Sequence, residues 1–251
     1  MGGGIPVCDP GDEVTLTVLG CDGSWPGPGG AGSGYLVRVG ATLLLLDAGP
    51  GTFAVLQTVI DPSEIDAVVI SHHHADHWTD LLAIHTQARL GGRRTTLPVY
   101  APAEVAERAG VERTPALDWR IVTHGDRAGI GEVSCAFHRT DHAEETLAVR
   151  IDGGGRALGY SADSGPAWSP EVLGSGLDLL LCEATYTAEH EGTAQHMSGR
   201  QAGSAARAAG AKRLVITHRW PTVDAREVAE EAAVAFGGPV EQAATGKEFT
   251  L

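Results

Sequence analysis

The chain has 251 residues, enough for one large domain or two small ones, and its 43% hydrophobic content is ordinary for a globular protein with a sizeable core. Its formal net charge is −14, from 32 acidic and 18 basic side chains, and no Lys/Arg cluster marks a nucleic-acid surface. Large polyanionic partners are therefore disfavoured, although bound divalent cations would still accommodate a small anionic substrate.

Cysteine use and the first residues bear on localisation. The 4 cysteines are scattered without a CxxC pair, so a disulfide framework is not expected. The first segment, MGGGIPVCDPGDE, lacks a basic region followed by an apolar stretch, and no apolar run approaches the length that spans a bilayer. We therefore expect a cytoplasmic protein with no membrane partner.

Short apolar segments open the chain, at 14–20, 34–40 and 41–49, and they predict an antiparallel start with a tight turn at Gly40. The Gly/Pro-rich segment between the first two lacks GxxxxGK[ST], and no helical pattern follows it, which favours a rim loop over a phosphate-binding loop. An apolar strand over 65–71 then leads into SHHHADH at 71–77. A helical pattern runs from Asp76 to Gly91 and Gly92.

The second half of the chain continues to alternate strands and helices. Helices are predicted at 102–110, 198–210 and 223–236, and strands near 119–124, 132–140, 178–184 and 213–218, with a hairpin over 146–162 and a last strand within 241–251. No linker or repeat separates two halves. We predict a single α/β domain over residues 1–251, with two sheets covered by helices.

Four histidines and an aspartate stand within the seven residues 71–77, directly after an apolar strand. In an extended strand end, His72 and His74 face the same way and can bind one ion, whereas His73 points elsewhere. Around the turn, Asp76 and His77 can address a second ion. Imidazole nitrogen and carboxylate oxygen are ordinary zinc ligands, and a catalytic site leaves a position for water. The segment therefore predicts a metal site.

A site with two ions needs further ligands, and His142, Asp163 and His218 each stand where an apolar run stops. Ligands in a sheet-based fold converge at such strand ends. The remaining histidines show no such pattern and are interpreted as surface or core residues: His73, His85, His124, His138 and His190. Four tryptophans are candidate pocket walls, with ordinary packing as the alternative: Trp25, Trp78, Trp168 and Trp220.

The pattern His72-x-His74-x-Asp76-His77, followed by His142, Asp163 and His218, resembles the ligand set of the metallo-β-lactamase superfamily. Further segments resemble ribonuclease Z and related phosphodiesterases: VLGCDGS at 18–24, LLLDAGPGT at 44–52, YSADSG at 160–165 and LCEATY at 181–186. The resemblance implies a four-layer αββα sandwich.

The same resemblance implies a site for two divalent cations, zinc favoured and manganese or iron as alternatives, which share a hydroxide. It places one cation on His72, His74 and His142 and the other on Asp76, His77 and His218, with Asp163 as the bridge.

Two further residues are candidates for catalysis, together with Asp76. In the ribonuclease Z branch, the Glu of an E-A-T/S motif and the His of H-x-S form a proton-donating pair, and they correspond to Glu183 and His196. A carboxylate that orients an imidazolium lets it protonate a leaving alkoxide. The alternative is structural, with Glu183 at the end of a strand and His196 at the start of a helix.

The resemblance also bears on the substrate. Ribonuclease Z grips transfer RNA with a long arm between the residues that correspond to His142 and Asp163, but here the intervening segment 143–162 predicts a plain hairpin. Together with the acidic charge, this disfavours structured RNA. The segments SGYLVR and HMSG and the tail from 217 are similar to actinobacterial cyclic-nucleotide phosphodiesterases. That similarity implies a small phosphodiester substrate, with cyclic AMP favoured.

Other functions remain as alternatives. The same ligands would serve a hydrolase of a carbonyl substrate (lactone, thioester or β-lactam) or a ribonuclease Z-like endoribonuclease without the arm. Flavodiiron proteins resemble H-x-E-x-D-H and are disfavoured by His74, and a degenerate binding module is disfavoured because the full ligand set is present. Members of this branch commonly form dimers, so a homodimer is an open alternative.

Overall fold

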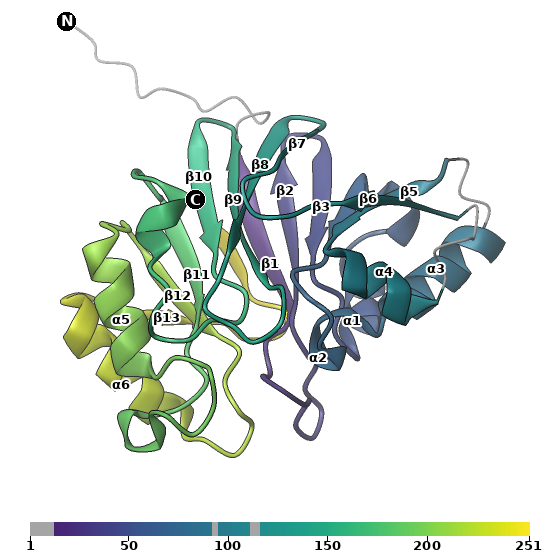
Figure 1. The fold of residues 1–251 in the computed structure, drawn as a ribbon. Helices are drawn as coiled ribbons and strands as arrows, with labels where there is room; N and C mark the ends of the chain where they lie inside the picture. The colour runs from purple at the N-terminus through teal and green to yellow at the C-terminus, as the bar shows by residue number, and fades with distance from the viewer. Residues whose placement is uncertain (1–12, 92–94, 111–115) are drawn as a thin grey trace, which may run out of the picture.

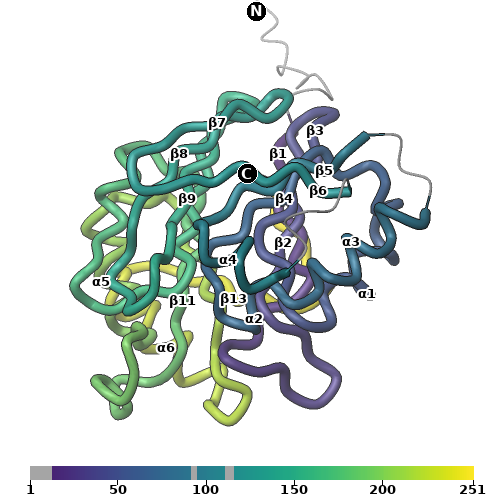
Figure 2. The backbone as a smooth tube through the Cα atoms, turned by 45° about the vertical axis from the view of Figure 1, so that its right-hand side comes forward, coloured from purple at the N-terminus to yellow at the C-terminus, as the bar shows by residue number. Residues whose placement is uncertain are grey.

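The computed structural model describes residues 13–91, 95–110 and 116–251. Two sheets face each other and helices cover their outer faces, so the layers follow the order αββα (Figure 1). Strands β1 to β6 form one sheet and β7 to β13 the other, the two lie side by side (Figure 2), and the last strand, β14, returns to the first sheet. The predicted four-layer sandwich is confirmed.

The first sheet has the strand order β14-β1-β2-β3-β4-β5-β6. Its strands are β1 (Val14–Gly20), β2 (Gly34–Val39), β3 (Thr42–Leu46), β4 (Ala67–Val69), β5 (Leu97–Ala101), β6 (Leu117–Ile121) and β14 (Glu248–Thr250). Pairing is antiparallel from β14 to β3 and parallel from β3 to β6. The antiparallel opening predicted from the first apolar segments is therefore correct.

The second sheet has the order β13-β12-β11-β10-β9-β8-β7. Its strands are β7 (Arg127–Ile130), β8 (Val133–Arg139), β9 (Leu147–Gly153), β10 (Arg156–Tyr160), β11 (Leu179–Glu183), β12 (Leu214–Thr217) and β13 (Glu241–Gln242). Pairing is antiparallel from β7 to β10 and parallel from β10 to β13. The carboxyl ends of β4, β10, β11 and β12 therefore carry loops to one edge of the sandwich.

Helices pack on both outer faces (Figure 1). The first sheet is covered by α1 (Thr52–Val59), α2 (Ala75–Trp78), α3 (Leu81–Leu90) and α4 (Ala103–Ala109), and the second by α5 (Gly199–Ala208) and α6 (Ala225–Phe236). Short 3₁₀ turns lie at Pro62–Glu64, Pro170–Leu173 and Ala188–His190. Apolar side chains fill the space between the sheets and the space beneath each helical layer. Within the described ranges, no helix has the length and apolarity needed to cross a membrane.

Several elements differ from the sequence prediction. Helix α1 and strands β5 and β7 were not predicted, and the helix expected from Asp76 is broken into α2 and α3. The break is held by tertiary bonds, because Asp80 N donates to Ala48 O at 2.9 Å and the Asp80 carboxylate accepts from Phe53 N at 2.8 Å. The last segment supplies two short strands, one to each sheet.

The cysteines of the described part of the chain, Cys21, Cys135 and Cys182, are free, in agreement with the prediction of no disulfide framework. Cys8 and the predicted helix end at Gly92 lie outside the described residues.

Gly49 allows the loop after β3 to approach the start of α2. A Cβ placed there would lie 2.0 Å from the backbone oxygen of Asp76 and 2.8 Å from Ser33 N. We expect Gly49→Ala to lower the free energy of unfolding by about 1–3 kcal/mol, because rigid backbone must move. Urea unfolding of metal-free protein measures this. The matched control is Gly129→Ala, where a Cβ meets nothing within 4 Å, and equal stability losses in both variants would contradict the explanation.

Candidate metal centre

All seven predicted ligands meet at the edge of the sandwich where the carboxyl ends of the parallel strands lie. His72 and His74 belong to the loop after β4, and Asp76 and His77 to α2, whereas His142, Asp163 and His218 follow β8, β10 and β12. The site therefore draws on both sheets, which explains why residues far apart in sequence come together.

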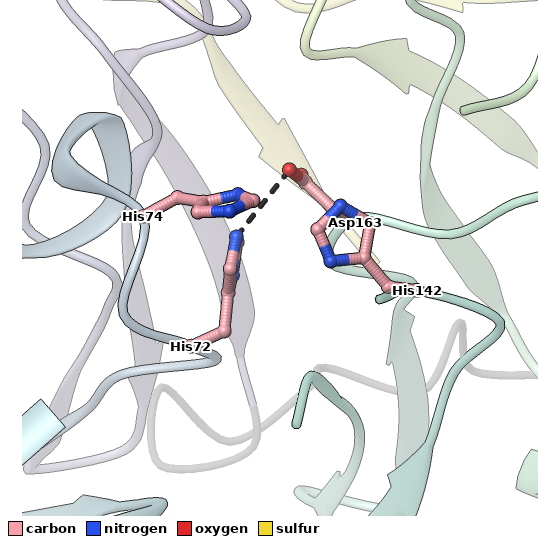
Figure 3. Close-up of side chains that lie close together, drawn as sticks. All are labelled: His72, His74, His142 and Asp163. Carbon is pink, nitrogen blue, oxygen red and sulfur yellow. Dashed lines mark ion pairs between the residues drawn. The ribbon is translucent and has the colours of Figure 1, made fainter. Parts of the chain in front are cut away.

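The first group consists of His72, His74, His142 and Asp163, whose potential ligand atoms lie within 4.8 Å of one another. Figure 3 shows the rings and the carboxylate facing a common space. The ring centroids of His72 and His74 are 4.7 Å apart, and those of His74 and His142 are 5.0 Å apart. His72 and His74 thus face the same space, as their spacing predicts.

The second group consists of Asp76, His77 and His218, again with potential ligand atoms within 4.8 Å of one another. Asp76 Oδ2 lies 3.2 Å from His218 Nε2 and 3.4 Å from His77 Nε2. The two groups adjoin, because the rings of His72 and His77 are 4.3 Å apart. The structure therefore brings together the two triads that the resemblance implies.

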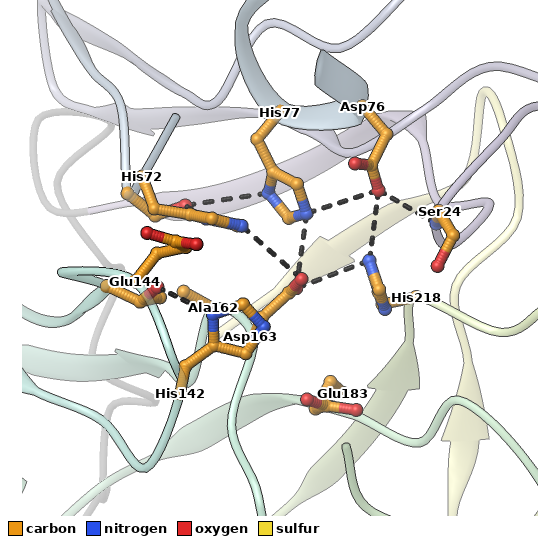
Figure 4. A network of polar contacts seen from close by, with 12 residues as sticks. Ser24, His72, Asp76, His77, His142, Glu144, Ala162, Asp163, Glu183 and His218 are labelled. Atoms are coloured by element: carbon orange, nitrogen blue, oxygen red, sulfur yellow. Dashed lines mark hydrogen bonds and ion pairs between the residues drawn. The ribbon is translucent and has the colours of Figure 1, made fainter. Parts of the chain in front are cut away.

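Asp163 faces both groups with different oxygen atoms (Figure 4). Its Oδ2 lies 3.5 Å from His72 Nε2, whereas its Oδ1 lies 3.1 Å from His77 Nε2 and 3.2 Å from His218 Nε2. The side chain is buried. Its position matches the bridging role that the resemblance implies.

In four of the five predicted histidine ligands, the Nδ1 atom contacts a side-chain oxygen of another residue. These contacts are His72 to Ser71 Oγ at 3.0 Å, His77 to Asp47 Oδ2 at 2.8 Å, His142 to Thr146 Oγ1 at 3.1 Å and His218 to Thr185 Oγ1 at 3.0 Å. Such contacts orient a ring and direct Nε2 toward a metal. The sequence reasoning missed these supporting residues. Among them, only Asp47 had a sequence feature that could have identified it, because it is an acidic residue at the end of the apolar run of β3.

The hydroxyls of Ser71 and Thr185 connect two of these rings to buried carboxylates. Ser71 Oγ donates to Asp47 Oδ2 at 2.8 Å, and Thr185 Oγ1 donates to Glu183 Oε2 at 2.7 Å. The Ser71 proton is thus directed at a carboxylate, and the Thr185 proton at Glu183 or at the backbone oxygen of His218, 3.1 Å away. Each hydroxyl oxygen is left to accept from the imidazole N–H. This fixes the tautomer in which Nε2 of His72 and of His218 is free to bind a cation.

Buried atoms in the centre lack hydrogen-bond partners among the described residues. His72 Nε2, His77 Nε2 and Asp163 Oδ1 lie close together without forming a hydrogen bond of ordinary geometry. Buried polar atoms without partners are costly, and a cation held between nitrogen and carboxylate oxygen removes that cost. The donor set therefore fits divalent metal ions.

The electrostatics of the groups agree with this interpretation. Burial lowers the pKa of His72 to about 4 and that of His142 to about 3, so both rings are in the neutral form that binds metal. Burial opposes a charged His77, but Asp163, Asp76 and Asp47 outweigh it and hold its pKa well above its ordinary value. The surplus of carboxylates therefore attracts positive charge to the second group.

Glu183 and His196 form a buried pair beside both groups. His196 Nδ1 lies 3.0 Å from Glu183 Oε1, and the His196 ring is 5.1 Å from that of His218 and 5.7 Å from that of His142. Burial lowers the pKa of His196, but Glu183 outweighs it and raises the value to about 9. Backbone N–H groups of Ser164 and Met197 also donate to the Glu183 carboxylate. The pair is thus placed at the site, although Glu183 also ends β11.

The other histidines and the tryptophans lie outside the two groups. His73 is buried, and its Nδ1 lies 2.7 Å from Glu104 Oε2. Trp78 and Trp168 pack in the two helical layers, which confirms ordinary packing for half of the tryptophans. Trp25 and Trp220 lie together, with ring centroids 6.1 Å apart.

Asp47 should control metal affinity through His77. Besides that ring, its carboxylate accepts hydrogen bonds from Ser71 N at 2.7 Å and Tyr160 Oη at 2.6 Å. We expect Asp47→Asn to weaken metal binding about 10- to 100-fold, because an amide cannot accept all of these bonds. Competition with a chelator measures the affinity. Tyr160→Phe is the control, since it removes one donor and leaves the carboxylate on His77. An unchanged affinity in Asp47→Asn would refute this role.

The profile of the β-lactamase superfamily domain, Lactamase_B_2, matches residues 42–219, the segment that holds all seven clustered residues. The chain belongs to the β-lactamase superfamily. The superfamily is hydrolytic, and the probable metallo-hydrolase YhfI of Bacillus subtilis is 32% identical over 244 residues, or 93% of this chain and 98% of YhfI. This superfamily member is therefore a metal-dependent hydrolase that binds divalent metal.

Other similarities agree in length and fold. The crystal structure of YhfI, a metallo-β-lactamase fold protein, superposes with a TM-score of 0.90 at 29% identity and covers 95% of this chain and all 100% of that one. An uncharacterized protein of Mycobacterium leprae is 34% identical over 256 residues, 95% of this chain and 89% of its own. Ribonuclease Z of Methanopyrus kandleri is 28% identical over 264 residues, 89% of this chain and 93% of its own.

Proposed function

We propose that this hydrolase is a phosphodiesterase with two metal ions and a small phosphodiester substrate, a cyclic nucleotide such as cyclic AMP being favoured. The observation that carries the proposal is the buried Glu183–His196 pair, whose ring lies beside His218 and His142. A proton donor at this place serves a reaction in which the leaving group is a poor alkoxide.

The metal ions would be held by the two groups described above. His72, His74 and His142 would hold one, Asp76, His77 and His218 the other, and Asp163 would contact both. When bound, two such cations lower the pKa of water and stabilise charge on the attacking and leaving oxygens of a displacement. A donor set rich in imidazole nitrogen favours zinc, with manganese and iron as alternatives.

His196 donates the proton in this proposal. Its Nδ1 faces Glu183, so Nε2 is the atom that can reach the leaving oxygen. Glu183 fixes the ring, and the N–H groups of Ser164 and Met197 fix Glu183 in turn. Such positioning keeps the donor aligned without reorganisation during the reaction.

Two observations favour a small substrate over structured RNA. The segment between His142 and Asp163 contains only β9 and β10, joined by a turn at Gly154 and Gly155, so no arm projects from it. The net charge of −14 opposes a long polyanion. The similarity to a ribonuclease Z supports phosphodiester chemistry.

A substrate panel tests the proposal. Protein of measured zinc and manganese content is offered bis(p-nitrophenyl) phosphate and cyclic AMP, with a lactone, a thioester and nitrocefin in parallel. We expect hydrolysis of the phosphodiesters and none of the carbonyl compounds. Turnover of a carbonyl compound with inert phosphodiesters would refute the proposal and make Glu183 and His196 structural residues.

A further inference from the structure

The loop between β1 and β2 rests directly on the presumed ligands of the second cation. Ser24 N donates to Asp76 Oδ2 at 2.8 Å (Figure 4), and Gly23 N donates to Arg219 O at 2.9 Å. A Cβ at Gly23 would lie 2.3 Å from the backbone oxygen of His218. The segment around Ser24 is therefore held at the rim beside Asp76 and His218.

Trp25 follows Ser24 and presents an exposed aromatic ring at this rim. The residue is 44% exposed, and it is the only aromatic among the exposed large hydrophobic residues of the described part of the chain. Its ring is tilted by 30° against Trp220, whose Nε1 donates to Ser24 Oγ at 2.9 Å. The Trp25 ring is therefore exposed, and the Trp220 ring against which it lies is held by a hydrogen bond.

The aromatic contacts continue from Trp220 toward the proposed proton donor. Trp220 packs on Tyr186, with ring centroids 5.5 Å apart, and Tyr186 Oη donates to the backbone oxygen of His196 at 2.8 Å. The His196 ring in turn lies 5.1 Å from that of His218. Contacts between three aromatic rings, Trp25, Trp220 and Tyr186, therefore connect the exposed ring at the rim to the backbone of His196.

We propose that Trp25, supported by Trp220, stacks on the base of a nucleotide substrate, an inference that rests on the proposed function. In a cyclic nucleotide the leaving oxygen stays attached to the sugar, so the nucleoside must lie on the side of the donor that protonates this oxygen. That donor is His196, and the contacts through Trp220 and Tyr186 connect the exposed Trp25 ring to its backbone. Stacking also needs no positive charge, which suits a protein with a net charge of −14.

Trp25→Ala tests the proposal with two substrates that differ only in the base. We expect kcat/KM for cyclic AMP to fall about 10- to 100-fold, mainly through KM, because stacking on an aromatic ring contributes that much per base. Ribose 3′,5′-cyclic phosphate without a base should change less than about 3-fold. Trp25→Phe should restore most of the loss, and Val234→Ala, at a site 83% exposed on α6, is the control.

Binding provides a second measurement that does not depend on turnover. Isothermal titration calorimetry should detect binding of adenosine 5′-monophosphate to the metal-loaded wild type, and Trp25→Ala should weaken this binding about 10-fold or more. Equal effects of the variant on both cyclic phosphates, or unchanged nucleotide binding, would overturn the stacking proposal and leave the ring for another partner. If the wild type hydrolyses neither cyclic phosphate, the phosphodiesterase proposal fails, and the calorimetric titration alone decides the stacking proposal.

Discussion

Replacing Asp163 with alanine should remove at least one of the two proposed cations and reduce hydrolysis by about three orders of magnitude or more. Its two carboxylate oxygens face opposite groups, at 3.1–3.5 Å from the Nε2 atoms of His72, His77 and His218. Without this carboxylate the five histidines and Asp76 remain, but a single negative charge must then serve two cations. Metal analysis after gel filtration, together with turnover of bis(p-nitrophenyl) phosphate, measures both effects.

The matched control for this variant is Asp118→Ala. Asp118 has a side chain that is 45% exposed and pairs with Arg120 on the surface, so its loss should leave metal content and turnover unchanged. Circular dichroism confirms that each variant is folded. Full metal content with normal turnover in Asp163→Ala would show that Asp163 is not a bridging ligand, and the assignment of the site would have to be revised.

The candidate ligands could be predicted from the sequence for a physical reason. Each one follows an apolar run, and parallel strands deliver their carboxyl ends to a single edge. The spacing of His72 and His74 reports their common orientation directly, whereas the approach of His218 to Asp76 depends on how the two sheets pack. Their positions at the ends of apolar runs identified His142, Asp163 and His218 as candidate ligands, and the resemblance assigned them to two cations.

The supporting contacts could not be predicted in the same way. Thr185 and Thr146 are ordinary residue types, and Thr185 is 33 residues from the ring that it orients. The backbone conformation at the site could not be predicted either. Asp47, Ala162 and His218 adopt positive φ values of 55°, 50° and 57° at the ends of strands. Non-glycine residues rarely adopt this conformation, and such strain is typically found at functional sites. The positive φ values turn the chain at the positions where the ligands converge. The residue types themselves do not predict such a turn.

Helix α1 and strand β5 were missed because their local sequence signals are weak or contrary. Helix α1 begins after Gly51, whose φ is 91°, and no side chain caps it. Strand β5 contains Pro98, which ordinarily demotes a run to an edge strand, yet it lies between β4 and β6. In both cases tertiary packing outweighs weak or contrary local signals, so neither element can be recognised from its own residues.

Replacing His196 with alanine should leave the metals bound but slow hydrolysis in a way that depends on the leaving group. On a phosphodiester with an alkyl leaving group, such as cyclic AMP, we expect a loss of about 10²- to 10⁴-fold, the usual contribution of a positioned acid. Nitrophenolate is a stable anion that leaves without a proton, so bis(p-nitrophenyl) phosphate should lose less than about 10-fold. Steady-state kinetics on the two substrates, with measured metal content, gives the ratio.

Glu183→Gln separates donation from positioning. The glutamine keeps one oxygen, which can accept from Ser164 N or from Met197 N but not from both, because these groups donate to different oxygens of Glu183. It also lacks the charge that raises the pKa of His196. It should therefore show the same preference for the better leaving group with a smaller loss, since the donor is present but less well held. Equal losses on both substrates in His196→Ala would assign the pair a structural role instead. A carbonyl substrate would then be the more reasonable one, because its hydrolysis depends less on protonating a poor alkoxide.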